Sequence, residues 1–174
     1  MSHFQEALSR AQRSSNLRVF GYKKSHFDLV AASGLAERQH RLGALAHRAL
    51  ESPRFAAQLF EMASKAIIGR ARARHWHIKR REDLHKFSVC VGGYWLRPYC
   101  TACDGRGVVV VGQVARDLCH VCNGTGQRAL PKPVDAGLEG IVDESRFDNY
   151  VRQALGCLDA HIASYLRSAR EALG

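Results

Sequence analysis

Apolar residues recur at spacings of three and four along most of the chain, a pattern typical of amphipathic helices. The longest such pattern runs from about residue 145 to the C-terminus through Phe147, Tyr150, Val151, Ala154, Leu155, Leu158, Ile162, Tyr165, Leu166 and Ala169. It predicts a helix of about 28 residues, roughly 40 Å long at the usual rise per residue. Ser145 and Asp148 have the spacing of a capping box at its start. Such a one-sided helix must bury its apolar face on other helices or on a partner subunit.

Shorter helical patterns occupy the N-terminal half. We expect an amphipathic segment at residues 4–13 and a longer helix over residues 27–50, which Gly34 and Gly43 weaken. Ser52 and Pro53 suit the start of another helix, because serine can cap it and proline needs no backbone donor there. Two apolar stripes follow; the first carries Phe55, Leu59, Met62, Ala63, Ala66 and Ile67, and the second Leu84, Phe87 and Val91. We expect the second helix to stop at residues 92–93, which are both glycine.

The region after residue 97 has a different pattern. Residues 108–111 are four valines between two glycines, which predicts one arm of a short β-hairpin. Residues 134–142 predict a short helix ahead of the long one. The fold expected from these patterns is mainly α, with a small module inserted. Its parts are a basic helical region at 1–97, the module at 98–129, and a C-terminal part at 130–174 whose long helix packs on the N-terminal region.

The inserted region contains the same motif twice, C-x-x-C-x-G-x-G, which we call a knuckle. The cysteines of the two knuckles are Cys100, Cys103, Cys119 and Cys122. Two thiolate pairs at this spacing complete the tetrahedron of one Zn²⁺ ion. The glycines support this interpretation over two unrelated C-x-x-C pairs or a redox dithiol, because the backbone must turn tightly beside sulfur. A site with four cysteine ligands is closed, so one structural zinc ion per chain is expected. Cys90 and Cys157 remain as buried free thiols.

The charge is concentrated in one part of the chain. The formal net charge is +10, and residues 1–97 alone carry 18 Lys/Arg against 7 Asp/Glu. Residues 69–81 hold the densest run, with two histidines and a tryptophan but no acid. A solvated helix face is the plain alternative, but a run without acids repels itself unless an anion binds, so we interpret it as a nucleic-acid contact. The candidate DNA-binding residues in it are Arg70, Arg72, Arg74, Lys79, Arg80 and Arg81.

The motifs of common enzyme classes are missing from the sequence. It has no phosphate-binding G-x-x-x-x-G-K-[ST] loop, no G-x-S-x-G elbow and no H-E-x-x-H pair. We therefore expect a non-enzyme without a small-molecule substrate. No apolar run reaches the roughly 18 residues of a membrane span, and the N-terminus lacks a signal-peptide pattern. We expect a cytoplasmic protein with no membrane partner.

Three functions remain open on the residues alone. A DNA-binding transcription regulator fits the charge asymmetry and the arginine-rich run. A chaperone-like protein-binding module fits the knuckles, because C-x-x-C-x-G-x-G is the zinc repeat of DnaJ co-chaperones. Those proteins usually carry four repeats and a His-Pro-Asp motif, which this chain lacks. A thiol oxidoreductase would need an exposed cysteine of low pKa.

The order of elements over residues 82–170 resembles the Q-type late-gene antitermination proteins of lambdoid phages. A helical region ends in an aromatic approach at residues 94–99, the two knuckles follow, and a basic, proline-marked exit at 127–131 leads to a long helix. The resemblance implies a zinc-containing, helix-turn-helix-like DNA reader. Such a protein recognises DNA at a phage late promoter and joins the sigma-containing RNA polymerase holoenzyme of the bacterial host, which then reads through terminators. It adds Arg128 and Lys132 to the DNA-binding candidates.

Overall fold

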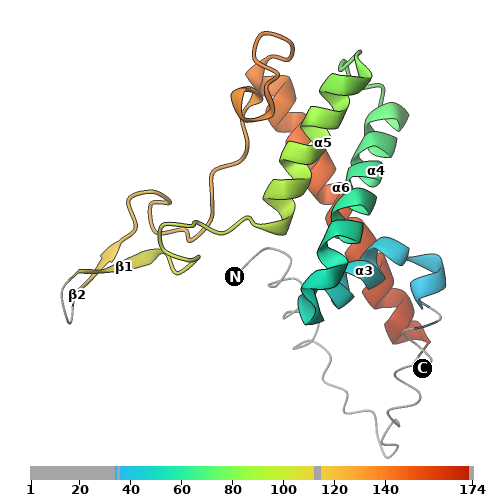
Figure 1. The fold of residues 1–174 in the computed structure, drawn as a ribbon, viewed down its shortest axis with the longest axis horizontal. Helices are drawn as coiled ribbons and strands as arrows, with labels where there is room; N and C mark the ends of the chain where they lie inside the picture. Colours follow the sequence, from blue (N-terminus) through green and yellow to red (C-terminus); the bar gives the residue numbers. More distant parts are fainter. Residues whose placement is uncertain (1–33, 35, 112–114, 173–174) are drawn as a thin grey trace, which may run out of the picture.

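The computed structural model describes residues 34, 36–111 and 115–172, and this part is mainly helical (Figure 1). Its elements in chain order are α3 (Arg41–Glu51), the 3₁₀ turn η1 (Pro53–Phe55), α4 (Ala56–Ala73), α5 (Arg81–Leu96), β1 (Val108–Val111), β2 (Ala115–Leu118), the 3₁₀ turn η2 (Pro133–Ala136) and α6 (Glu144–Glu171). The mainly α fold is confirmed, with a small two-stranded sheet between α5 and α6. The segment expected at residues 4–13 lies outside the described residues, as does the first part of the helix expected at 27–50.

The longest helix is α6, with the 28 residues that its apolar pattern predicts. The capping box expected at Ser145 is wrong, because the N-cap lies two residues earlier. Asp143 is the N-cap, and its side chain accepts a hydrogen bond from the backbone N–H of Arg146 at 2.9 Å. The extended backbone of Asp143 places its carboxylate over the first turn, where a free backbone donor needs a partner.

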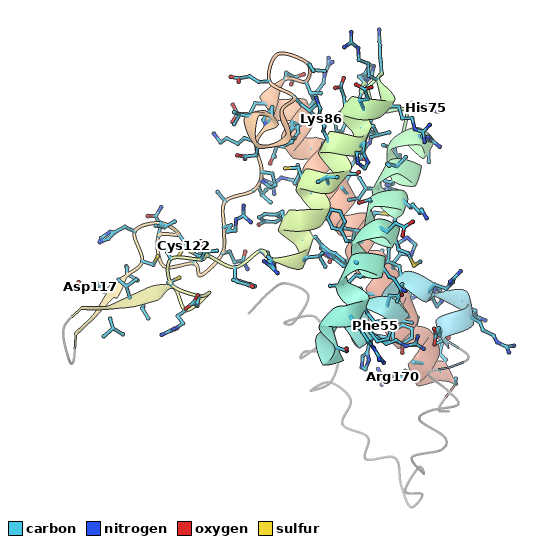
Figure 2. The ribbon with its side chains drawn as sticks, viewed as in Figure 1. Phe55, His75, Lys86, Asp117, Cys122 and Arg170 are labelled. Atoms are coloured by element: carbon cyan, nitrogen blue, oxygen red, sulfur yellow. The ribbon has the colours of Figure 1, made fainter. Side chains whose placement is uncertain are left out.

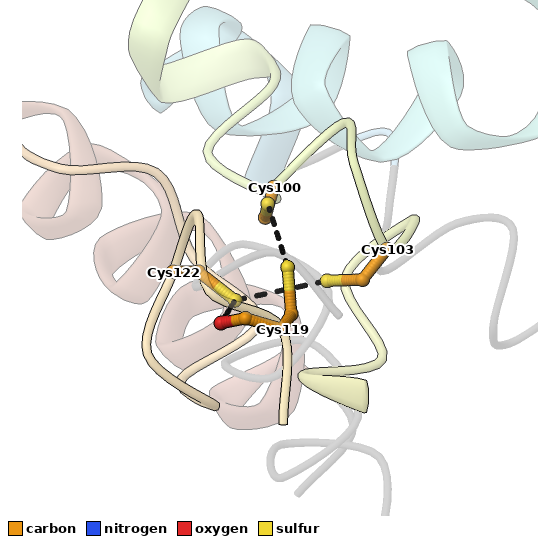
Figure 3. A group of neighbouring side chains, drawn as sticks. All are labelled: Cys100, Cys103, Cys119 and Cys122. Atoms are coloured by element: carbon orange, nitrogen blue, oxygen red, sulfur yellow. Dashed lines mark hydrogen bonds between the residues drawn. The ribbon is translucent and has the colours of Figure 1, made fainter. Parts of the chain in front are cut away.

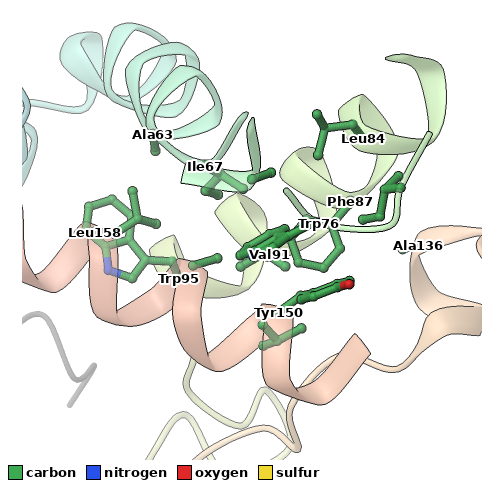
Figure 4. Close-up of a cluster of buried hydrophobic side chains, with 14 of the residues drawn as sticks. Ala63, Ile67, Trp76, Leu84, Phe87, Val91, Trp95, Ala136, Tyr150 and Leu158 are labelled. Carbon is green, nitrogen blue, oxygen red and sulfur yellow. The ribbon is translucent and has the colours of Figure 1, made fainter. Parts of the chain in front are cut away.

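The apolar face of α6 is buried on the helices that precede it, and Figure 4 shows part of this core. Trp76 stacks on Tyr150 with ring centroids 4.5 Å apart, and its edge contacts Phe87. Phe87 in turn packs edge-on against Phe147. Trp95 donates its indole N–H to Asp159 of α6 at 3.1 Å. The aromatic residues of α5 and α6 therefore hold these two helices together.

Helix α5 does not stop at the paired glycines, so that prediction is wrong. It continues through Gly92 and Gly93 to Leu96. Gly92 is buried and faces α4, where a Cβ atom would lie in van der Waals contact with the ring of Phe60, at 3.4 Å. The helix ends instead before Pro98, which has no backbone N–H and disfavours helical geometry in the residue before it.

Two boundaries in the N-terminal half also differ from the sequence pattern. The helix expected over residues 27–50 is interrupted at His40, with φ −130°, and Gly43 lies within α3, where it packs against Tyr165 of α6. Ser52 does not cap α4 with its side chain. Its carbonyl instead accepts a hydrogen bond from the N–H of Phe55, which closes the 3₁₀ turn that Pro53 begins.

The helix expected at residues 134–142 is also wrong in type. A 3₁₀ turn over Pro133–Ala136 ends at Gly137, whose φ is 62°. The left-handed backbone at Gly137, and again at Gly140, prevents a continuous helix from forming there. Leu138 and Val142 are buried nonetheless, so this irregular segment lies against the helical core.

The hairpin is confirmed. Strands β1 and β2 pair antiparallel, with Val108 opposite Leu118 and Val111 opposite Ala115. The cysteine module, residues 98–129, projects away from the helices (Figure 1). The two ends of the module, together with the residues next to them, join it to the helices. We call these two segments, residues 97–99 and 127–130, the neck. In the neck the N–H of Arg128 donates to the carbonyl of Pro98 at 2.8 Å.

Candidate metal centre and basic surface

The four knuckle cysteines meet in the centre of the cysteine module (Figure 3). Their sulfur atoms all lie within 4.8 Å of one another and are buried. The Sγ atoms of Cys100 and Cys119 are 3.9 Å apart, and those of Cys103 and Cys122 are 3.7 Å apart. Disulfide sulfurs are separated by only about 2.05 Å, so these are four separate thiols around one centre. The group can hold one metal ion.

The two knuckles are related by an approximate two-fold repeat in their hydrogen bonds. The N–H of Gly107 donates to Cys103 Sγ at 3.2 Å, and the N–H of Gly126 donates to Cys122 Sγ at 3.3 Å. The carbonyls of the same two glycines accept from the N–H groups of Cys119 and Cys100, each at 2.8 Å. Each knuckle is therefore hydrogen-bonded to the other, and the fold of the module requires both.

Glycine is required at Gly107 and Gly126 for two reasons. Both have positive φ, 75° and 71°, which other residues rarely adopt. A Cβ atom on Gly107 would also collide with the carbonyl oxygen of Gly124, and one on Gly126 with that of Gly105. The tight turn beside sulfur that the repeated motif predicts is thus confirmed.

Hydrogen bonding and burial act on the thiols in opposite directions. Burial raises the pKa of Cys103 to about 11, because a thiolate there loses its water. Burial also acts to raise the pKa of Cys122, but the N–H of Gly126 and the neighbouring thiols outweigh it and lower that pKa to about 7. The Cys122 thiolate therefore forms readily, whereas Cys103 resists ionising. A bound cation would displace the remaining protons.

The other two cysteines are separate from this centre. Cys90 and Cys157 are half-buried free thiols, and burial raises the pKa of each. All six cysteines lie in the described residues, and none is exposed. Thiol exchange needs an accessible thiolate, a requirement that Cys90 and Cys157 meet poorly.

Five of the candidate DNA-binding residues gather where α4 meets α5. Arg72 lies in the last turn of α4, and Arg74 is the C-cap of that helix. Lys79 lies in the connection, Arg80 is the N-cap of α5 and Arg81 is its first residue. All five are exposed. We call this group the basic corner. None of the five has an ion pair with another described residue.

The arginine-rich run is not a single helix face. Trp76 and Ile78, from its middle, point inward and are buried in the main core. These two side chains fix the connection between α4 and α5, so the charged residues on either side must face solvent. His75 and Lys86 mark this end of the helices in Figure 2, and Phe55 and Arg170 mark the opposite end.

The remaining three candidates lie elsewhere. Arg70 is half-buried, and its Nε atom is buried with no hydrogen-bond partner among the described residues. Arg128 lies in the neck, where its backbone carbonyl accepts from the Tyr94 hydroxyl at 3.2 Å. Lys132 is ion-paired with Glu144 at 3.0 Å. The structure therefore separates the eight candidates into the basic corner and three isolated positions.

Two exposed residues of α5 extend the basic corner and were missed by sequence reasoning. His85 lies four residues after Arg81 and therefore shares its face, and Lys86 follows. The spacing of four residues from Arg81 could have identified His85, but not Lys86, which is five residues away. The sequence carried no comparable signal for residues of α6 that face the neck, because their proximity depends on the tertiary fold.

Comparisons with known proteins identify no relative: no protein-family model, curated protein or solved structure matches the chain. Among the described residues, no helix combines the length and apolar character needed to cross a membrane. A function must therefore be argued from the metal centre and the surface of this chain.

Proposed function

We propose that the protein is a DNA-binding transcription antitermination factor. In this proposal it binds duplex DNA at a phage late promoter, loads onto the bacterial RNA polymerase holoenzyme with its sigma factor, and promotes readthrough of terminators. It would act in the cytoplasm of the bacterial host. The order of helices, knuckles and basic exit that resembles the Q-type proteins supports the polymerase part, and the basic corner supports the DNA part.

The single observation that carries the proposal is the exposed, unpaired charge of the basic corner. Five cations occupy a short connection and the two helix ends beside it, with no ion-pair partner in the described part of the chain. Unpaired cations at this density bind phosphates by releasing condensed counterions. The burial of Trp76 and Ile78 beneath them gives this surface a rigid base.

We further propose that the metal is zinc. A tetrahedral ion with Zn–S bonds of about 2.3 Å requires sulfur atoms about 3.8 Å apart. The two Sγ pairs at 3.9 and 3.7 Å agree with that separation. Four thiolates leave no open position for water or substrate, so the ion would stabilise the module without catalysing a reaction. Its role would be to hold the neck, and with it the chain entering α6, in one geometry.

A run-through transcription assay tests the proposal directly. We expect the purified, zinc-loaded protein to increase the fraction of transcripts that pass an intrinsic terminator. The template should carry the late promoter of the phage from which the protein derives, and transcripts should be separated by length. Because the effect requires DNA loading, the same terminator behind an unrelated promoter should show no increase.

The variant that controls this assay lacks the positive charge of the basic corner. With Arg72, Arg74, Lys79, Arg80 and Arg81 changed to alanine, readthrough should return to the level without protein. Unchanged termination with the wild-type protein on its own promoter would contradict antitermination. It would leave a promoter repressor or a chaperone-like module as the remaining possibilities, and promoter occupancy by footprinting would distinguish these.

The alternative of a DnaJ-type protein-binding module is favoured by one observation. Val110, Leu118 and Val121 of the cysteine module are 63%, 66% and 75% exposed, although they are apolar. Leu118 lies opposite Val108 in the hairpin and covers Gly124 of the second knuckle. Exposed apolar groups in a small module are typical of surfaces that bind other proteins.

The chaperone alternative makes its own prediction. If the cysteine module binds unfolded chains, the protein should slow the aggregation of a chemically denatured enzyme, measured by light scattering. Changing Val110, Leu118 and Val121 to serine should then abolish that activity and leave readthrough unchanged. No effect of the wild-type protein on aggregation would exclude this alternative.

A further inference from the structure

A groove of about 410 Å³ lies where the neck meets the helices. The end of α5 forms one wall, both segments of the neck form another, and the middle of α6 forms the floor. Residues that define it are Trp95, Pro98, Arg128, Leu130, Leu155 and Gly156. It is separate from the metal centre and from the basic corner, and nothing in the proposed function uses it.

The floor of the groove is bare because of Gly156. This glycine lies in the middle of the 28-residue helix α6, is exposed, and has no atom within 4 Å of where a Cβ would be. Glycine in a helix interior costs about 1 kcal/mol relative to alanine. No packing contact within the described residues requires this glycine, and because it lines the groove, a side chain at this position would occupy the groove.

The inner surface of the groove is apolar. Leu130 and Leu155 are half-buried and line it. The polar atoms of the two aromatic residues beneath them have partners within the fold: the Tyr94 hydroxyl donates to the Arg128 carbonyl, and the Trp95 indole donates to Asp159. Tyr94 and Trp95 are only 7% and 4% exposed. Their ring faces are therefore covered, which disfavours stacking with nucleic-acid bases.

The rim of the groove carries two arginines, of which one is unpaired among the described residues. The Arg128 side chain is exposed and forms no ion pair with a described residue. Arg152 is also exposed at the rim and is paired with Asp148 at 2.9 Å. The one carboxylate in the lining, Asp159, accepts the Trp95 indole N–H. An apolar floor with an arginine rim is complementary to an apolar side chain flanked by acids.

We propose that this groove binds an apolar side chain carried by an acidic segment of a partner protein. Its volume lies near the lower end of the range for ligand pockets, about 300–1,000 Å³, which suits one or two side chains. An occupant would touch both the neck and α6, and would thereby hold the cysteine module against the helices. The identification of the partner as RNA polymerase rests on the proposed function. The choice of an apolar side chain in an acidic segment rests on the groove alone.

The test uses the full zinc-loaded chain and short capped peptides, with binding followed by NMR. The probe is a peptide of four glutamates around one leucine. We expect saturable shifts of the Trp95 indole and Gly156 amide signals. A peptide with lysines in place of the glutamates, and one with serine in place of the leucine, should shift them at least about tenfold more weakly. Equal shifts with the lysine peptide, or no shift with the probe, would overturn the proposal. Stronger binding of a dinucleotide would also overturn it, in favour of a nucleic-acid site.

Two variants separate binding from folding. Gly156→Gln should fill the groove and lower affinity for the probe at least about tenfold without lowering the melting temperature, because glutamine is a better helix former. Gly69→Gln is the matched control, since Gly69 is an exposed helical glycine of α4 with open space over it. It should bind the probe as the wild type does. If Gly156→Gln binds the probe as tightly as Gly69→Gln does, the groove is not the binding site.

Arg128→Glu tests the role of the charge through the preference between the two peptides, which a purely structural role of Arg128 would not reverse. Reversing the charge at the rim should reverse the preference, so that the lysine peptide binds more tightly than the glutamate peptide. Retention of the original preference would contradict the role of Arg128. A separate binding assay with purified RNA polymerase tests the source of the partner. Failure of the wild-type protein there would count against the proposed function, whereas failure of the peptide would count against the groove.

Discussion

Cys100→Ser should release the bound metal ion and unfold residues 98–129 while the helices stay folded. Among the side chains that the structure describes in this module, only Val109 packs against the four buried cysteines. No described residue of the module belongs to the main core, which is formed by the helices and the chain leading into α6. Structural zinc contributes about 10–16 kcal/mol to small modules of this kind, which the remaining contacts cannot replace.

Metal content and NMR spectra together measure this effect. The metal per chain should fall from one to near zero, and amide signals of residues 98–129 should collapse to disordered positions. The helical circular dichroism signal should change little. Cys90→Ser is the matched control, because Cys90 is a half-buried free thiol outside the centre, and it should retain the ion. One metal ion per chain in the Cys100 variant, with an unchanged spectrum, would rule out the metal-dependent fold.

Alanine at all five positions of the basic corner should weaken duplex DNA binding at least about a hundredfold at moderate salt. Each phosphate contact contributes about 0.9 to the magnitude of the slope of log K against log salt concentration, so this magnitude should fall by up to about 4.5. The measurement is fluorescence anisotropy with a labelled duplex over a range of salt concentrations. The substituted side chains are exposed, so the melting temperature should change little.

A pair of double variants controls for net charge. Arg72→Ala with Arg74→Ala removes two charges from the end of α4, and Arg167→Ala with Arg170→Ala removes two near the end of α6. All four side chains are exposed, but Arg170 lies at the opposite end of the helices from the corner (Figure 2). Only the first pair should lower the salt slope, by up to about two. If both pairs lowered the salt slope equally, DNA binding would depend on the net charge of the protein and not on the basic corner.

Local patterns in the sequence predicted the elements whose interactions are local. The length of α6 followed from its apolar stripe, and the hairpin from its run of valines. The four cysteines were correctly grouped because the ligand spacing and the glycine turns both occur within short sequence motifs. In each case the physical constraint acts between residues close together in the chain.

Element ends were less predictable, because competing local signals are weak compared with packing. The paired glycines predicted the end of α5 at residues 92–93, yet the helix continues to Leu96, with Gly92 buried against α4. The cap of α6 lies at Asp143 and not at Ser145, because Asp143 adopts the extended backbone and accepts a hydrogen bond from the N–H of Arg146. Energies of about 1 kcal/mol decide such positions, and the burial of one aromatic side chain exceeds them.

The sequence by itself determined that this is a mainly helical chain with two glycine-bearing cysteine knuckles and a basic N-terminal half. Only the tertiary structure decided which charges act together. It turned Trp76 into the core and left five neighbouring cations exposed, paired Lys132 with Glu144, and half-buried Arg70. It also brought Gly156 beside the neck. The physical reason is that the geometry of a short motif depends on its own backbone. A surface, in contrast, is formed by residues from elements that are distant in the chain and meet only in the folded protein.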